Sequence, residues 1–116
     1  ANASITGTYN ATTTNYSNVT GNSDELPNGS GYTTGGYALT NVNPTSSGTT
    51  AFTDFSANAA WSSATFTTRG CIIYNTSDGN SAVAVINFGA DYSVSGGTFE
   101  IQWPTADSSN AIIRIA

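Results

Sequence analysis

The chain lacks histidine, lysine and methionine, and it has a single cysteine among its 116 residues. Histidine is the side chain most used for proton transfer near neutral pH and for binding metals, and lysine is needed for Schiff bases and P-loops. One cysteine cannot form an internal disulfide or a thiolate zinc site, so the cysteine count does not indicate whether the protein resides in an oxidising or a reducing compartment. These absences count against most classes of enzyme, and we expect a protein with no catalytic activity, metal or cofactor.

Positive charge is also scarce. Two arginines stand against seven acidic residues, which gives a formal net charge of -5 with only 8% of residues charged. Such a chain cannot neutralise a run of phosphates, so we expect no nucleic-acid partner. No apolar run approaches the ~20 residues that span a bilayer, and we expect no membrane partner. Solubility must rest on Ser, Thr and Asn, which make up about two-fifths of the chain.

The length supports one domain, because two would each lack an adequate core. Residues 1–30 are mostly Asn, Thr, Ser and Gly, and they bury too little apolar surface to fold alone. We predict a polar N-terminal arm over residues 1–30 that lies on its own domain or on a neighbouring subunit. The arm contains one or two weak strands, for example over 4–9, and could hold one helical turn at 23–26, while residues 31–116 form the folded domain.

Strand signals are clear from residue 31 onward. The segments between the strands at 75–81, 89–97 and 104–110 are rich in turn formers and short enough for hairpins. We therefore predict an all-β protein, a small antiparallel β-sandwich whose C-terminal half is a meander of four strands. The expected strands span 37–42, 49–55, 64–68 and 70–74 (one strand or two, with a bulge at Gly70), 82–88, 98–103 and 111–115.

The last predicted hairpin has a register that pairs Trp103 with Ala111. Ile101 then faces Ile113 and Phe99 faces Ile115, so one face of the hairpin is wholly apolar. In the same register Glu100 lies opposite Arg114, and we predict a cross-strand ion pair between them.

The hairpin before it, with Tyr74 opposite Ala82, is apolar on both faces. One face carries Cys71, Ile73, Val83 and Val85, and the other carries Ile72, Tyr74, Ala84 and Ile86. An antiparallel sheet in a small monomer usually has one solvated face. The second face must be covered by the arm, by the strands between 31 and 55, or by another chain. The candidate inter-subunit surface consists of Ile72, Tyr74, Ile86, Phe88 and Ile112.

Other candidate sites have simpler explanations. Cys71 lies within a strand and is expected to be a buried small hydrophobe. The loop 75–80 could hold calcium, although a hairpin turn explains its composition better. Scattered carboxylates leave a glycosidase pair open, and the Tyr and Trp residues could include a sugar-stacking platform, although core and interface roles are expected for most of them.

Several ordered stretches resemble a family of small virion proteins of tailed bacteriophages. They are Gly29-Ser30-Gly31-Tyr32-Thr33-Thr34-Gly35-Gly36, Trp61 with Ala64-Thr65-Phe66-Thr67-Thr68-Arg69, Ile72-Ile73-Tyr74, Ala84-Val85-Ile86-Asn87-Phe88-Gly89 and Gly97-Thr98-Phe99-Glu100-Ile101-Gln102-Trp103. Members of the family have a longer and more charged front half, where this chain has its polar arm.

The resemblance implies a structural protein of the virion that is assembled in the host cytoplasm. The favoured placement is the capsid exterior, as a decoration or cement protein that binds the major capsid protein and bridges its neighbouring subunits. A homo-oligomer is expected, and a trimer by analogy. The alternatives are a neck or tail component and a carbohydrate-binding β-sandwich.

Overall fold

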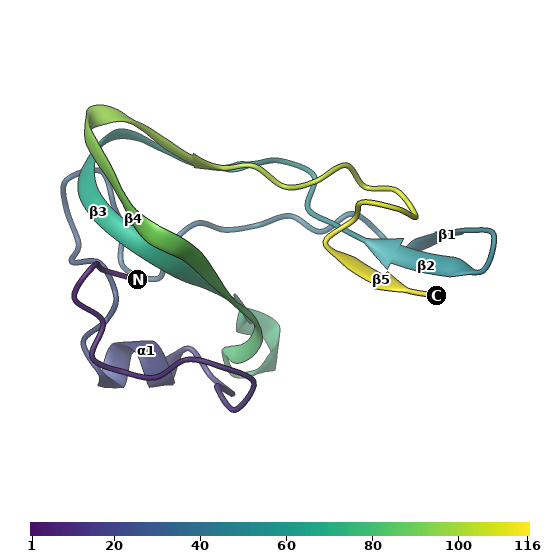
Figure 1. The fold of residues 1–116 in the computed structure, drawn as a ribbon, viewed down its shortest axis with the longest axis horizontal. Helices are drawn as coiled ribbons and strands as arrows, with labels where there is room; N and C mark the ends of the chain where they lie inside the picture. Colours follow the sequence, from purple (N-terminus) through teal and green to yellow (C-terminus); the bar gives the residue numbers. More distant parts are fainter.

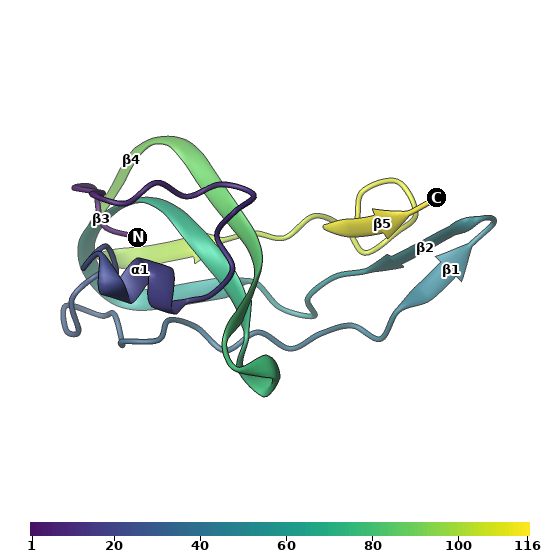
Figure 2. The same ribbon diagram turned by 90° about the horizontal axis from the view of Figure 1, so that it is seen from below.

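Two antiparallel sheets hold almost all the regular structure in the computed structural model, which describes residues 1–116. A two-stranded ribbon and the N-terminal segment make up one region, called the body, and a three-stranded sheet forms the other, called the tip (Figures 1 and 2). The predicted all-β class is confirmed, whereas the sandwich is not. The strands are β1 (Thr45–Ser47), β2 (Thr50–Thr53), β3 (Ala59–Asn75), β4 (Ser81–Ile101) and β5 (Ile113–Ile115).

The ribbon of β3 and β4 is strongly curled. A strand of 17 residues would be about 56 Å long if straight, whereas the longest dimension of the whole molecule is 44 Å. The pairing of β3 with β4 shifts register at several points along the ribbon, and Gly89 and Gly96 of β4 adopt positive φ. Such irregularities bend and twist a sheet, which explains the curled ribbon in Figure 1.

One predicted irregularity is present at Gly70. The register changes between Thr68 and Gly70, because Thr68 pairs with Tyr92 while Gly70 pairs with Asn87. A Cβ at Gly70 would lie 2.6 Å from the Ile86 carbonyl oxygen, so no larger residue fits at this crossing. Glycine therefore lets the two strands approach closely where the ribbon bends.

The predicted meander is wrong. Residues 89–97 do not form a hairpin loop, because they lie inside the continuous strand β4 and part of them pairs with residues 64–68 of β3. Glycine-rich sequence indicates turns, but here positive φ at Gly89 and Gly96 bends the strand without reversing it. The hairpin at 75–81 does form, with Tyr74 opposite Ala82 and a 3-10 turn at Thr76–Asp78.

The N-terminal segment and its helix lie below the ribbon in Figure 1. Asn2 forms an isolated bridge with Thr68, and the Thr65 N–H donates to the Ser30 carbonyl, so the segment is hydrogen-bonded to β3 near both of its ends. The helix α1 (Ser17–Gly21) begins six residues before the expected turn at 23–26, which is not helical. It has five residues, and no helix is long and apolar enough to cross a membrane.

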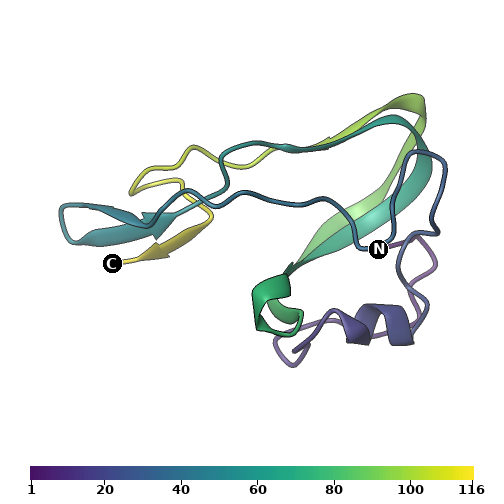
Figure 3. The same ribbon diagram turned by 180° about the vertical axis from the view of Figure 1, so that it is seen from behind.

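The tip is attached to the body by three extended segments, residues 37–44, 54–58 and 102–112 (Figure 3). The sheet order is β1-β2-β5, so the C-terminal strand pairs with β2. The predicted pairing of β5 with the end of β4 is therefore wrong. The predicted strand over 37–42 is absent too, apart from a single bridge between Asn41 and Phe55.

Few residues are removed from solvent. Only 10 of 116 residues are buried, and the apolar ones are Val19, Leu26, Ala59, Ala64, Ile73 and Ala111. The radius of gyration is 15.0 Å, compared with about 13 Å for a compact domain of this length. The chain is thus more open than a self-contained globule of its size.

Candidate functional site

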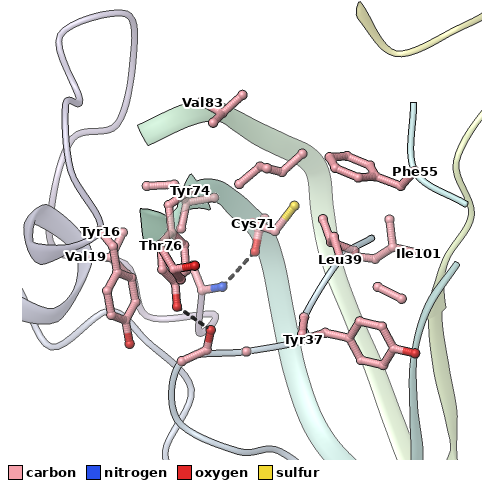
Figure 4. A pocket seen from close by; sticks show the side chains of 18 of the residues that line it. Tyr16, Val19, Tyr37, Leu39, Phe55, Cys71, Tyr74, Thr76, Val83 and Ile101 are labelled. Atoms are coloured by element: carbon pink, nitrogen blue, oxygen red, sulfur yellow. Dashed lines mark hydrogen bonds between the residues drawn. The ribbon is translucent and has the colours of Figure 1, made fainter. Parts of the chain in front are cut away.

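An open cavity of about 700 Å³ lies between the ribbon and the segments that lead to the tip. Its wall is mainly apolar. Figure 4 shows Val83 from β4, Cys71 and Tyr74 from β3, and Phe55 and Leu39 from the connecting segments around this space. A domain interior is normally packed to the density of an organic crystal. An apolar space this large is therefore a place where further protein surface could be buried.

The largest aromatic cluster lies along this wall. The ring centroid of Trp61 lies 6.3 Å from that of Tyr32, 5.5 Å from that of Tyr37 and 5.9 Å from that of Phe99. Phe99 is in turn 5.4 Å from Phe66. Such tilted and edge contacts contribute about 0.5–1.5 kcal/mol each beyond area burial. The rings therefore stabilise one another along the wall of the cavity.

Glu25 is a polar anchor at the end of the ribbon. Its carboxylate accepts hydrogen bonds from the Tyr16 hydroxyl at 2.6 Å, the Tyr32 hydroxyl at 2.9 Å and the Gly35 N–H at 2.7 Å. Burial and the bond to Glu25 raise the pKa of both phenols. The Tyr16 ring stacks on Tyr74 with centroids 4.4 Å apart. These contacts hold the N-terminal segment over Tyr74, which lies half-buried within its own chain.

Asp24, with no exposed surface, is a second anchor. It accepts bonds from the Thr6 N–H at 2.8 Å, the Gly7 N–H at 2.7 Å and the Tyr9 hydroxyl at 2.5 Å. Burial alone would raise the pKa of Asp24, but the donors from Tyr9, Thr6 and Gly7 outweigh it, and the pKa lies below the usual 3.8. The carboxylate thus organises residues 6–9, which have no apolar core of their own.

Asp54 fixes the tip. It is 2% exposed, and its carboxylate accepts bonds from the Phe55 N–H at 2.8 Å and the Ile112 N–H at 3.1 Å. Its carbonyl accepts from the Val42 N–H. All three segments that lead to the tip therefore meet at one side chain and its backbone.

The junction also holds an unpaired donor. The Trp103 indole N–H is buried and has no acceptor from the chain, and the ring packs 5.1 Å from Phe55. Buried polar groups are nearly always paired, so this indole N–H is an exception within the chain.

The predicted inter-subunit surface does not lie on one face. A bulge between Ile73 and Tyr74 makes Ile72 pair with Val85 and Cys71 pair with Ile86, so Ile72 and Ile86 point to opposite sides of the ribbon. Phe88 packs against Tyr92 and Phe99. All five candidates, Ile72, Tyr74, Ile86, Phe88 and Ile112, are half-buried within the chain.

The predicted ion pair between Glu100 and Arg114 does not form. Glu100 accepts a bond from the Asn58 amide, while Arg114 lies opposite Phe52 and donates to the Ser109 carbonyl. The one salt bridge in the structure joins Arg69 to Asp91 at 3.2 Å, across the bend of the ribbon.

Sequence reasoning missed two exposed apolar residues of the tip. Ile113 is 42% exposed and Ile115 is 71% exposed, although the predicted register placed both in the sandwich core. Their alternation with Arg114 was a visible signal of a one-faced strand. The prediction was wrong about the strand that pairs with residues 113–115, because the local sequence pattern does not specify the pairing partner. Cys71 is half-buried against the cavity, and burial raises the pKa of its thiol.

The comparisons with known proteins give no relative: no family model, no curated protein and no solved structure matches this chain.

Proposed function

We propose that the protein is a structural subunit of a tailed-bacteriophage virion. In this proposal it decorates the capsid exterior as a homo-oligomer and stabilises the head by bridging neighbouring subunits of the major capsid protein. The placement in a virion rests on the sequence resemblance described above. The assembly role rests on the exposed surface of the chain.

The observation that carries the assembly role is the accessible surface of 6881 Å². A monomeric protein of this mass, 11.9 kDa, exposes about 5,900 Å². The excess is therefore about 900 Å², close to the roughly 800 Å² that each partner buries in a standard interface. Burying that area on another chain would bring the protein to the packing expected for its size.

The distribution of the surface fits the same role. The anchors at Asp24, Glu25 and Asp54 fix the N-terminal segment and the tip by hydrogen bonds, so the chain has a defined shape although its core is small. A shaped surface can be recognised without refolding, and many weak contacts in a symmetric array give high avidity.

Two measurements test the proposal. Light scattering on the purified protein is expected to give a homo-oligomer, and a cryo-electron microscopy reconstruction of a particle that contains the chain is expected to place it on the outer surface of the shell. Density in the neck or tail would replace the capsid placement. A monomer that binds glycans would replace the proposal with the carbohydrate-binding alternative.

A further inference from the structure

The tip is a sheet without a core. Every residue of β1 and β5 is exposed, and no residue of β2 is fully buried. Ile113 and Ile115 lie on one face with Ala51, since Ala51 pairs with Ile115 and side chains alternate along a strand. A small sheet needs an apolar face packed on something to be stable. A contact outside its own chain would therefore bury this face and stabilise the tip.

Both edges of this sheet are free, and their hydrogen-bonding groups can be derived from the pairing. The two-residue turn at Gly48-Thr49 closes the hairpin, so Ser47 and Thr50 form a hydrogen-bonded pair. Alternation along the strands then turns the N–H and C=O of Ser46 outward on β1. The same rule turns those of Arg114 outward on β5, and neither residue's backbone has a hydrogen-bond partner on that side.

The two edges of one molecule complement each other. Each strand is three residues long. If β5 paired with β5 about a two-fold axis, Arg114 would lie directly opposite another Arg114, which is destabilising. If β5 pairs with β1 of a second copy, Arg114 lies opposite the uncharged Ser46. Charge therefore disfavours a two-fold contact through β5, and a two-fold contact through β1 would leave the β5 edge unpaired.

We propose that β5 of one copy adds to the free edge of β1 in the next copy, so that the tips join into one continuous sheet. Each copy then donates one edge and accepts one, which is a heterologous contact that closes into a ring where the rotation between copies brings the last tip back to the first. This inference rests on the self-assembly in the proposed function and names the surface that performs it. The occupant of each edge is a second copy of this chain.

The test uses proline to block each edge separately. Because the Ser46 and Arg114 N–H groups point outward, Ser46→Pro and Arg114→Pro remove a donor from the edge and leave the ladders with β2 intact. The matched controls are Ser46→Ala and Arg114→Ala, which keep the backbone N–H. Circular dichroism and thermal unfolding verify that each variant is folded.

Each proline variant is expected to have the mass of a monomer, while both alanine controls keep the wild-type mass. The decisive sample is a 1:1 mixture of the two proline variants. The intact β5 of Ser46→Pro can pair with the intact β1 of Arg114→Pro, so the mixture is expected to give a heterodimer of twice the monomer mass and nothing larger.

Other results separate this inference from the proposed function. If both proline variants keep the wild-type mass, or if their mixture stays monomeric, head-to-tail pairing of the tips is wrong while self-assembly stands. If only one proline variant loses assembly, the contact is two-fold, through β5 for Arg114→Pro or through β1 for Ser46→Pro, and the inference is overturned. If the wild-type protein is itself a monomer, the proposed assembly fails as well.

Discussion

The body and the tip solve the same problem, a shortage of apolar residues, in different ways. In the body, the carboxylates of Asp24 and Glu25 accept hydrogen bonds from backbone and phenol donors, and aromatic rings pack against one another along the ribbon. In the tip, burial is confined to the attachment point at Asp54 and Ala111, and every residue of β1 and β5 is exposed. The body is stabilised by contacts within the chain, whereas the strands of the tip have few such contacts.

We therefore expect stability to depend on the body and association to depend on the tip. Regions with few buried contacts and exposed backbone hydrogen bonds open most easily, so the tip is expected to be the least stable part of an isolated chain. Changes in the body should alter folding. Changes in the tip should alter association and leave the body folded.

The largest expected effect is the loss of the Asp24 carboxylate. Asp24→Ala leaves the N–H groups of Thr6 and Gly7 and the Tyr9 hydroxyl without their acceptor. We expect a loss of about 3 kcal/mol in the free energy of unfolding, measured by urea denaturation. The matched control is Asp78→Ala in the exposed turn, which should change stability by less than about 0.5 kcal/mol. Equal effects at the two sites would contradict the anchoring role of Asp24.

A somewhat smaller effect is expected at the bend of the ribbon. In Gly70→Ala the new methyl group would lie 2.6 Å from the Ile86 carbonyl oxygen, so the strands must separate. We expect a loss of about 2 kcal/mol in thermal or urea unfolding. Gly97→Ala is the control in the same ribbon, because its Cβ would meet only the Val94 side chain at 3.5 Å. A Gly97→Ala variant as unstable as Gly70→Ala would show that the close approach is not the cause.

Acid should loosen the body gradually. The folded pKa of Asp24 is lower than its unfolded value, so the stabilisation is complete above the unfolded pKa of 3.8 and is lost as the pH falls through the folded pKa. We expect the body to lose stability below about pH 4, measured by tyrosine fluorescence in urea titrations at several pH values. Asp24→Asn should flatten this dependence, and an unchanged pH profile in that variant would assign the titration to another group.

The smallest effect on folding is expected in the tip. Ile115→Ser should change the unfolding of the body by less than about 0.5 kcal/mol, because the side chain is 71% exposed. The same substitution at Ile73, which is 8% exposed, should cost about 3 kcal/mol. Ile115→Ser should nevertheless weaken association, measured as a shift of the oligomer to monomer on dilution. A variant with wild-type association would remove this face of the tip from the interface.

Much of the secondary structure could be predicted from the sequence, because strands and tight turns are local. The alternation in residues 64–74 and 82–88, the turn at 75–81 and the irregularity at Gly70 are all present. The wrong predictions concern which strands pair with one another. Judged from the local sequence alone, the glycines at 89–97 fit a hairpin turn and a β-bulge equally well. Which of the two forms depends on where the long strand bends.

The polar anchors could not be predicted for the same reason. Ser23 to Leu26 has the pattern of a helix start, yet Asp24 binds residues 6–9 and Glu25 binds residues 16, 32 and 35. The sequence position of a hydrogen-bond acceptor does not reveal which donors it binds, because such pairs follow no regular spacing. One register slip between Ile73 and Tyr74 likewise divided the predicted surface between two faces.

The mass of the wild-type protein in solution tests the central claim most directly. A chain that exposes about 900 Å² more than a compact monomer should bury that area on copies of itself. Static light scattering over a range of concentrations should therefore give a multiple of 11.9 kDa that falls on dilution. A mass of 11.9 kDa at every concentration would contradict the account.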